Sequence, residues 1–322
     1  MKKGLIGERL THSYSKVIHE YINNDVYNLY SLNKDEFKLF IENKDFNFVN
    51  VTIPYKQDVI HYLDEIKLEA KDIGAVNLVI NENGKLIGYN TDYYGFKSML
   101  EYNNVSVYNK NCLILGTGGT SKTVFKVLSD LGAKSIYKAS RKKDEENKNI
   151  ISYSDVYNYD FDIIINTTPV GMYPNLNNTV VDCSKFKKIE FIGDVVYNPL
   201  RTRLLIDAEK LNIKHDNGLL MLICQAIKAH EIYYKEEVSK EKIIEIKKHI
   251  EKEKKNIVLI GMPGSGKSTV GKILGDTCLK EYIDMDQYIE EKTNMSIPKI
   301  FAEYGEEYFR DLETNKIKEL MK

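Results

Sequence analysis

The stretch Asn111-Cys112-Leu113-Ile114-Leu115-Gly116-Thr117-Gly118-Gly119-Thr120-Ser121 decides the fold of this 322-residue chain. Its apolar beginning predicts a buried strand, and the pattern that follows predicts a helix over Lys122 to Leu131. Between them Gly116 permits a tight bend, and Gly118 lets a ligand approach the backbone at the helix N-terminus. A strand, a glycine turn and a helix in this order indicate an α/β domain with a phosphate-binding turn.

The next strand towards the C-terminus, Lys134 to Ala139, ends in Ser140-Arg141-Lys142-Lys143. A Rossmann domain that binds NAD would place a carboxylate there, whereas arginine suits the additional phosphate of NADP. The sequence therefore favours NADP, with Ser140 and Arg141 in contact with it. A solvated basic turn remains the alternative, above all for Lys142 and Lys143. Further buried strands are expected at Phe161 to Asn166 and Phe191 to Val196.

The part of the chain before this domain also alternates strands and helices, which predicts a parallel α/β sheet. Its third strand runs into Asn50-Val51-Thr52-Ile53-Pro54-Tyr55-Lys56, where Pro54 restricts the backbone and presents Lys56 from a rigid turn. Ligands of such sheets bind at the carboxyl ends of strands, where Thr52 and Lys56 lie. The expected elements are strands Lys3–Gly7, Val26–Leu29 and Phe46–Ile53, helices Lys16–Asn23, Asp35–Glu42 and Lys56–Ala70, and a hairpin of Leu78–Ile80 and Leu86–Gly88 turning at Glu82-Asn83-Gly84.

Composition limits the classes of function. With 43% hydrophobic residues, 29% charged residues and a formal net charge of -1, the composition predicts an ordinary soluble chain of two or three domains and gives no electrostatic case for binding nucleic acid or membrane surfaces. The four cysteines lack Cys-x-x-Cys spacing, which favours neither a zinc site nor a disulfide framework and fits a reducing cytoplasm. The sequence contains no run of 18 apolar residues and no apolar leader, so no membrane segment is expected.

Several motifs together resemble the shikimate dehydrogenases, the NADP-dependent reductases of the chorismate pathway. Asn50 to Lys56 is similar to their catalytic-lysine motif, and Ser13-Tyr14-Ser15 to their paired serines. The resemblance continues through the motifs at Asn77 and at Asn90-Thr91-Asp92. It spans about Leu5 to Tyr233 and adds Asn166-Thr167-Thr168-Pro169-Val170-Gly171-Met172, Asp194-Val195-Val196-Tyr197-Asn198-Pro199 and the segment Gly218 to Gln225.

The resemblance implies a set of site residues. Lys56 and Asp92 are the implied catalytic pair, and Lys56 is the candidate donor of the proton to the substrate's ketone oxygen. Lys16 departs from the proline that this family usually carries after the paired serines. The implied substrate contacts are Ser13, Ser15, Thr52, Asn77, Asp92, Tyr197 and Gln225. The expected contacts of NADP(H) are Gly116, Gly118, Gly119, Thr120, Ser140, Arg141, Thr167, Val195 and Gly218.

Each of these residues also has a purely structural interpretation. The serines and Asn90 or Asp92 can serve as helix caps, and most lysines are solvated and without function. Which of Lys56 and Asp92 is the formal proton donor stays open, as does shikimate against quinate as substrate. A protein that binds nucleotides without turnover is the non-enzymatic alternative, against which the intact Lys56 and Asp92 argue.

The C-terminal part carries a second nucleotide motif. An apolar strand is expected at Asn256–Ile260, and Gly261-Met262-Pro263-Gly264-Ser265-Gly266-Lys267-Ser268 follows it as a complete P-loop. Backbone amides of such a loop cradle phosphates, and the hydroxyl of Ser268 is a candidate Mg²⁺ ligand. ATP and Mg²⁺ are thus further candidate ligands. The predicted P-loop contacts are Gly261, Gly264, Gly266, Lys267, Ser268 and Thr269.

The segment after the P-loop resembles shikimate kinase. By this resemblance Asp286 and Arg310 would bind shikimate, and Asp284, which follows a second expected strand, would lie near the metal. Only 67 residues follow Lys255, fewer than such a fold needs, so we expect a fragment or a vestigial appendage without kinase activity. A bifunctional dehydrogenase-kinase is the alternative.

The expected organisation is therefore an N-terminal α/β substrate domain (1–103, completed by a helix over 217–237) and a Rossmann NADP domain (104–216). A charged helical linker (238–255) and a partial P-loop α/β segment (256–322) follow. The linker is expected as a helix because Ile243, Ile246 and Ile250 recur at helical spacing. The expected partner is a small-molecule substrate, and the oligomeric state is not readable.

Overall fold

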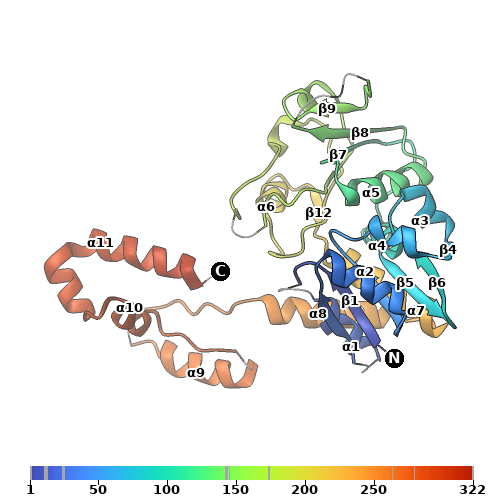
Figure 1. Ribbon diagram of the computed structural model, residues 1–322. Helices are drawn as coiled ribbons and strands as arrows, with labels where there is room; N and C mark the ends of the chain where they lie inside the picture. The colour runs from blue at the N-terminus through green and yellow to red at the C-terminus, as the bar shows by residue number, and fades with distance from the viewer. Residues whose placement is uncertain are drawn as a thin grey trace. The chain divides into compact units, whose positions relative to one another are not determined.

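The computed structural model describes residues 2–10, 14–23, 26–141, 144, 146–172, 175–262, 264–278 and 280–320. The chain divides into two compact units, Met1–Lys254 and Lys255–Lys322 (Figure 1). The first unit contains two six-stranded sheets, and helices make up the regular structure described in the second. No helix among the described residues has both the length and the apolar character that a membrane crossing requires.

The first sheet of the first unit is mixed, in the order β2-β1-β3-β5-β6-β4. Strands β1 and β2 and strands β1 and β3 pair in parallel, as expected, but β5 runs antiparallel to both β3 and β6. The predicted hairpin is confirmed as β5 and β6, which turn at Asn83 and Gly84, both with positive φ. The antiparallel pairing of β5 with β3 was not predicted. The strands are β1 Lys2–Gly7, β2 Asn28–Ser31, β3 Phe46–Val51, β4 Glu65–Ile66, β5 Leu78–Glu82 and β6 Lys85–Tyr89.

The second sheet is parallel throughout, in the order β12-β11-β10-β7-β8-β9, which confirms the expected Rossmann-type half. Its central strand β7 and its neighbour β10 are almost completely buried, as their continuous apolar sequences predict. The strands are β7 Asn111–Leu115, β8 Ser135–Ser140, β9 Ile150–Ser152, β10 Ile163–Asn166, β11 Phe191–Asp194 and β12 Lys214–Asp216.

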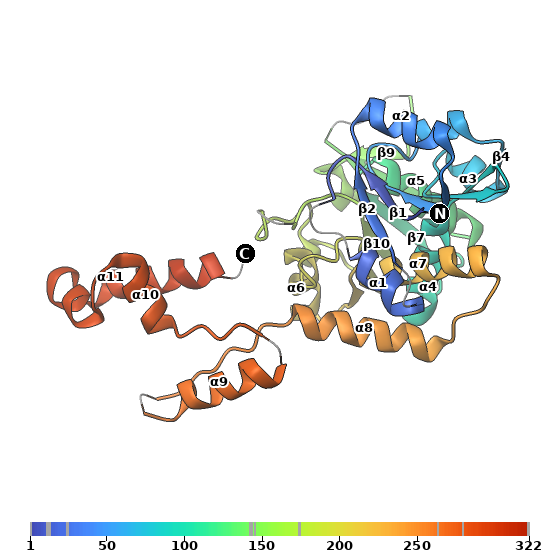
Figure 2. The ribbon, with the colours of Figure 1, turned by 60° about the horizontal axis from the view of Figure 1, so that its bottom comes forward.

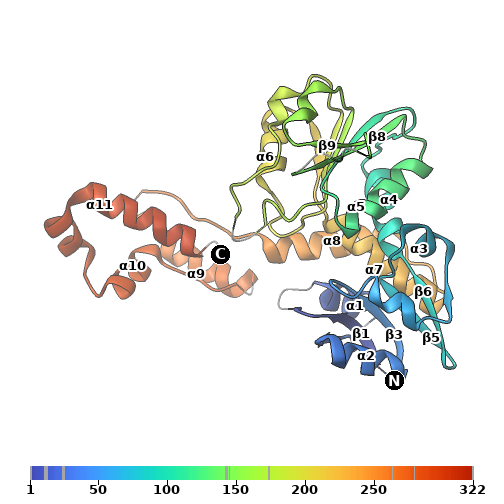
Figure 3. The ribbon, with the colours of Figure 1, turned by 45° about the horizontal axis from the view of Figure 1, so that its top comes forward.

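Two helices connect the sheets. Helix α4 (Thr91–Tyr102) packs along α7 (Leu219–Tyr234), and both bury apolar side chains against the second sheet (Figure 3). Ala229 of α7 also joins the core of the first sheet. The other helices of the unit are α1 Ser15–Asn23, α2 Lys34–Asn43, α3 Leu68–Ile73, α5 Gly119–Asp130, α6 Arg203–Lys210 and α8 Lys240–Lys254, with short 3₁₀ turns at Asp58–Tyr62, Asp155–Asn158 and Cys183–Lys185.

Two expectations about helices need correction. The helix expected over Lys56 to Ala70 is a 3₁₀ turn, the short strand β4 and helix α3, because Glu65 and Ile66 pair with β6 and interrupt the helical path. The predicted linker helix is present as α8, but it is part of the first unit. Its isoleucines Ile243, Ile246 and Ile250 are buried against α7 and α1 (Figure 2).

The second unit contains α9 (Lys267–Cys278), α10 (Met285–Thr293) and α11 (Ile297–Leu320), the last interrupted at Gly305, which has a positive φ. Ile289, Ile300 and Phe309 form its small core. The strands expected at Asn256–Ile260 and before Asp284 are absent from the described residues of this unit. Within these residues no second strand offers the backbone partners that a strand needs, and Val258 and Ile260 are 78% and 90% exposed.

Candidate active site

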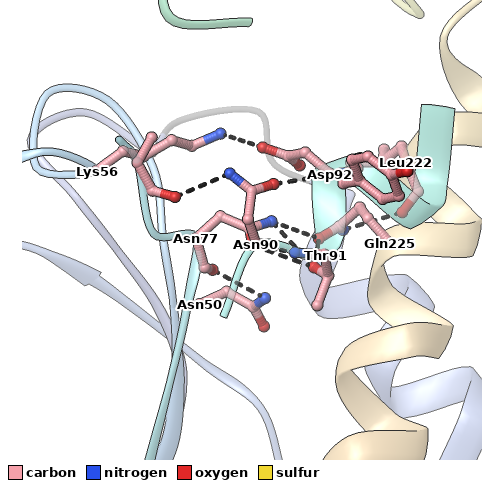
Figure 4. Close-up of polar contacts among 10 residues, drawn as sticks. Asn50, Lys56, Asn77, Asn90, Thr91, Asp92, Leu222 and Gln225 are labelled. Carbon is pink, nitrogen blue, oxygen red and sulfur yellow. Dashed lines mark hydrogen bonds and ion pairs between the residues drawn. The ribbon is translucent and has the colours of Figure 1, made fainter. Parts of the chain in front are cut away.

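The centre of the site is an ion pair between a loop and a helix. Lys56 lies in the turn after β3, and Asp92 lies in the first turn of α4. The Lys56 ammonium donates a hydrogen bond of 2.6 Å to Oδ2 of Asp92, and the side chains are 27% and 16% exposed (Figure 4). This ammonium is therefore fixed at a water-accessible position by a carboxylate, which is the arrangement a proton-transfer group needs.

A buried amide and hydroxyl network supports this pair. Asn77, Thr91 and Gln225 lie side by side in Figure 4 and are 3%, 0% and 7% exposed. Asn77 Nδ2 donates to Thr91 Oγ1 at 3.0 Å, and the Thr91 backbone N–H donates to Asn77 Oδ1 at 2.6 Å. Thr91 Oγ1 lies 3.3 Å from Gln225 Oε1, and Gln225 Nε2 donates to the Leu222 carbonyl at 2.9 Å. The network joins the residue before β5 to α4 and α7, and so fixes the start of α4, from which Asp92 projects.

A cavity of about 420 Å³ opens onto these groups. Seven residues of the predicted substrate and catalytic set line it: Ser15, Thr52, Lys56, Asn77, Asp92, Tyr197 and Gln225. Ser13, the other predicted member, lies outside the described residues. The remaining lining residues are Leu5, Arg9, Leu10, Asn50, Val51, Met172 and Leu222. The walls combine apolar side chains with polar ones, and the charged residues include the cations Arg9 and Lys56 and the anion Asp92. Such a lining suits a small polar molecule.

The sequence did not indicate three polar residues of this site. Arg9 follows β1 and is exposed, and no ion pair joins it to another described residue. Asn50 is buried, accepts from the Tyr27 hydroxyl at 2.8 Å and donates to the Asn77 carbonyl at 3.3 Å. Thr91 is fully buried between Asn77 and Gln225. Asn50 between the apolar residues Val49 and Val51 of β3 was the one available sequence signal.

Tyr197 reaches the cavity from the loop after β11, and Asp194 holds that loop. The Asp194 carboxylate is fully buried and accepts hydrogen bonds from Thr202 Oγ1 at 2.7 Å, Asn166 Nδ2 at 2.9 Å and the Val196 backbone N–H at 3.0 Å. Burial raises the pKa of this carboxyl to about 6, although the three hydrogen bonds oppose the shift. The Asp-x-Val-Tyr motif thus contains one residue that faces the cavity and one that fixes the loop.

The glycine turn after β7 is open to a ligand. Gly116 has φ +103, and a Cβ there would meet the Thr168 side chain at 2.9 Å. A Cβ on Gly118 or Gly119 would meet no atom of the described residues within 4 Å, so these residues leave open space beside the backbone at the N-terminus of α5. Unobstructed backbone at a helix N-terminus is what a pyrophosphate needs, and the turn therefore fits NADP(H).

The other predicted cofactor residues stand at strand ends of the same sheet. Ser140 ends β8, and Arg141 follows it as an exposed side chain. Thr167 follows β10 and donates its hydroxyl to the Leu115 carbonyl at 2.7 Å. Gly218 has a packing role besides any cofactor contact, because a Cβ there would lie 2.0 Å from the Val195 carbonyl oxygen. Thr120 lies in the first turn of α5.

The P-loop of the second unit has the backbone that its glycines predict, with positive φ at Gly261, Gly264 and Gly266. Lys267 Nζ donates to the carbonyls of Gly261 and Met262 at 2.8 and 2.9 Å, and so bends back over the loop. Ser268 Oγ donates to Asp284 Oδ2 at 3.1 Å, so the hydroxyl expected to bind Mg²⁺ lies beside a carboxylate. Thr269 follows within α9.

Asp286 and Arg310 are not joined by an ion pair. Burial, and after it the charge of Asp284, raise the pKa of the Asp286 carboxyl. The Arg310 guanidinium pairs with Glu306 and Glu313, each at 3.2 Å. Within the described residues no group of three or more His, Cys, Asp or Glu side chains could hold a metal ion.

Comparison with known proteins agrees with this site. The family model described as "Shikimate dehydrogenase substrate binding domain" matches residues 5–79, and the model described as "Shikimate kinase" matches residues 263–322. A curated relative, "Shikimate dehydrogenase (NADP(+))" from Clostridium beijerinckii, is 43% identical over 245 residues, which cover 71% of this chain and 90% of the relative.

Two solved structures have the same fold. A chorismate mutase/shikimate 5-dehydrogenase fusion protein from Clostridium acetobutylicum superposes with a TM-score of 0.75 at 36% identity, covering 79% of this chain and 98% of the other. A shikimate dehydrogenase solved in complex with NADP⁺ gives a TM-score of 0.69 at 35% identity, covering 76% and 94%. With the lysine-carboxylate pair, the polar cavity and the open glycine turn, these similarities show that the chain belongs to the NADP-dependent shikimate dehydrogenases.

Proposed function

We propose that the cavity of the first unit is the active site at which this chain reduces 3-dehydroshikimate to shikimate, reversibly and with NADPH. The observation that carries the proposal is the 2.6 Å contact between Lys56 and Asp92 at a cavity of about 420 Å³. Membership of the shikimate dehydrogenases supports the reaction, and the lining residues support the assignment of roles.

NADP(H), when bound, supplies the hydride that moves to or from the carbon bearing the reacting oxygen. Lys56 holds a proton at Nζ for that oxygen during reduction and receives it during oxidation. Asp92 accepts a hydrogen bond from the ammonium, orients it and forms the second half of the proton-transfer pair. Asn77 and Gln225 orient the hydroxyl groups of the ring, because their amides are fixed by Thr91 and the Leu222 carbonyl.

The substrate's carboxylate is held at the part of the cavity that the start of α1 lines. Ser15 begins α1 and is buried, and the N-terminus of a helix favours an anion. Ser13, Thr52 and Tyr197 complete this set. On the cofactor side, Gly116, Gly118, Gly119 and Thr120 surround the pyrophosphate at α5, Arg141 and Ser140 bind the adenosine phosphate, and Thr167, Val195 and Gly218 lie towards the nicotinamide.

The test is the absorbance of NADPH in a mixture of the full chain with shikimate and NADP⁺, repeated with NAD⁺ and with quinate. Growth of the band with shikimate and NADP⁺, well above that with NAD⁺, supports both the reaction and the role of Arg141. Equal rates with the two cofactors would remove Arg141 from the cofactor site. A folded chain without turnover of either substrate would overturn the assignment.

A second function is supported by the P-loop and by the match of residues 263–322 to shikimate kinase. We propose that the second unit binds ATP and Mg²⁺ through Lys267, Ser268 and the amides of the loop, with Asp286 and Arg310 on the side of a shikimate molecule. Titration of the full chain with ATP and Mg²⁺ tests binding, with Lys267→Ala expected to abolish it. Formation of shikimate phosphate by the chain would make it a bifunctional dehydrogenase-kinase, against our expectation of binding without phosphorylation.

We also propose the organisation into a substrate domain (1–103 with 217–237), a cofactor domain (104–216), a helical segment (238–255) and a P-loop segment (256–322). The two sheets and the packing of α7 on α4 support the first division.

A cytoplasmic location fits the free thiols Cys112, Cys183 and Cys224, all buried. Cell fractionation tests the location.

A further inference from the structure

Lys254, the last residue of α8, contacts two distant parts of the first unit at once. Its ammonium donates to Asn198 Oδ1 at 2.8 Å, in the loop after β11. It also lies 4.2 Å from the centroid of the Tyr14 ring and 5.9 Å from that of Tyr197. The two rings meet edge to face with centroids 6.2 Å apart. Residues before α1, after β11 and at the end of α8 therefore share one cluster.

The ammonium in this cluster has an uncommon environment. Lys254 is partly buried, and the loss of hydration lowers its pKa. No carboxylate in the described part of the chain forms an ion pair with it, whereas Lys247 on the same helix pairs with Glu251 at 3.1 Å. The faces of aromatic rings attract a partly desolvated cation, so Tyr14 and Tyr197 take the place of an anionic partner.

The cluster adjoins the active-site cavity on two sides. Tyr197 lines the cavity directly, and Ser15, the neighbour of Tyr14, lines it from the start of α1. Lys254 does not line the cavity itself. Any effect on substrate must therefore pass through the residues that it holds.

We propose that Lys254 is a positioning residue for the dehydrogenase, which fixes Tyr197 against Tyr14 and so sets the wall of the cavity that receives the substrate's carboxylate. The inference rests on the proposed function, since it concerns the same cavity. It adds a role for α8, whose end is not part of any predicted site. When the ammonium is absent, Tyr197 and the loop of Asn198 lose their contact with α8. The substrate must then order this wall of the cavity as it binds, which lowers its affinity.

The experiment compares the full chain with Lys254→Met, Lys254→Arg and Lys252→Met in steady-state oxidation of shikimate by NADP⁺. Methionine keeps most of the apolar stem but removes the charge and the hydrogen bond. We expect the KM for shikimate to rise about fivefold in Lys254→Met, from the typical strength of a cation-π contact. The kcat and the KM for NADP⁺ should stay within about twofold of the parent values. Lys254→Arg should restore the KM, and Lys252→Met, an exposed position on the same helix, should not change it.

A double-mutant cycle separates positioning from general stability. In a Tyr197→Leu background Lys254→Met should have no further effect on the KM for shikimate, because the residue acts through the tyrosine. A full fivefold effect in that background, an unchanged KM in Lys254→Met, or a failure of arginine to restore it would each overturn the proposal. Thermal unfolding of each variant checks that the fold is intact. An unsubstituted chain that does not oxidise shikimate would instead overturn the proposed function, which distinguishes the two failures.

Discussion

Lys56 is the residue on which the chemistry depends. The carboxylate of Asp92 holds it, and no other lysine is found among the described residues that line the cavity. We expect Lys56→Ala to lower kcat by about 10²- to 10⁴-fold, the usual contribution of a general acid, because the group that holds the proton for the substrate's oxygen is removed. Binding of NADPH, followed by its fluorescence, should be unchanged. Turnover at the parental rate would make Lys56 an ordinary turn lysine.

His19 gives the first unit a dependence on pH. It is buried, it stacks on Tyr27 with ring centroids 4.1 Å apart, and its Nε2 has no hydrogen-bond partner in the described structure. Burial, and after it the charge of His230, lower the pKa of His19 from 6.5 to about 3. The unfolded chain binds this proton below about pH 6.5 and the folded chain does not, so the free energy of unfolding falls as the pH falls through this range.

Asp194 acts in the opposite direction, since its folded pKa of about 6 lies above the ordinary 3.8. Between about pH 6 and 4 the folded state binds a proton at Asp194 and the unfolded state does not. Acidification in this range therefore raises the free energy of unfolding and partly offsets the loss caused by His19. His19→Phe should therefore gain stability relative to the parent by up to about 1.4 kcal/mol per pH unit as the pH is lowered. Urea unfolding at several pH values measures this difference. A constant difference would show that His19 titrates normally in the folded chain.

At the scale of elements, the packing of α4 on α7 sets the distance between the catalytic and substrate groups. Gly95 of α4 allows this approach, because a Cβ there would lie 2.5 Å from the Met221 carbonyl oxygen and 3.1 Å from the Gln225 backbone nitrogen. Helix propensity alone predicts that Gly95→Ala stabilises α4 by up to about 1 kcal/mol. We expect the reverse, a loss of about 1–3 kcal/mol in urea unfolding, together with a higher KM for shikimate as Gln225 is displaced. A higher free energy of unfolding in Gly95→Ala than in the parent would contradict the close contact of Gly95 with α7.

At the scale of the whole molecule, the two units should separate on limited proteolysis. Lys255 and Ile257–Ile260 lie between helices α8 and α9, belong to no helix or strand, and are exposed, with Ile260 at 90%. Brief treatment with trypsin should cut first after Lys254 or Lys255 and leave a fragment of the first unit that still oxidises shikimate. Mass spectrometry of the first products identifies the cut. Initial cleavage within residues 26–141 would show that the first unit is the less stable one.

Sequence by itself determined the class of the fold, the glycine turn and most of the candidate site, because these depend on local patterns. Gly116 and Gly118 lie between a predicted strand and a predicted helix, which identifies their turn, and Lys56 and Asp92 lie within motifs that resemble those of a known family. Only the tertiary structure decided that Asn50 and Thr91 belong to the site, that α8 packs into the first unit, and that Lys254 meets Tyr14 and Tyr197. It also decided that Glu65 and Ile66 form a strand and that Asn256–Ile260 does not. The physical reason is the same in each case: burial, strand pairing and the partner of a charge depend on residues far away in the chain, which no local pattern contains.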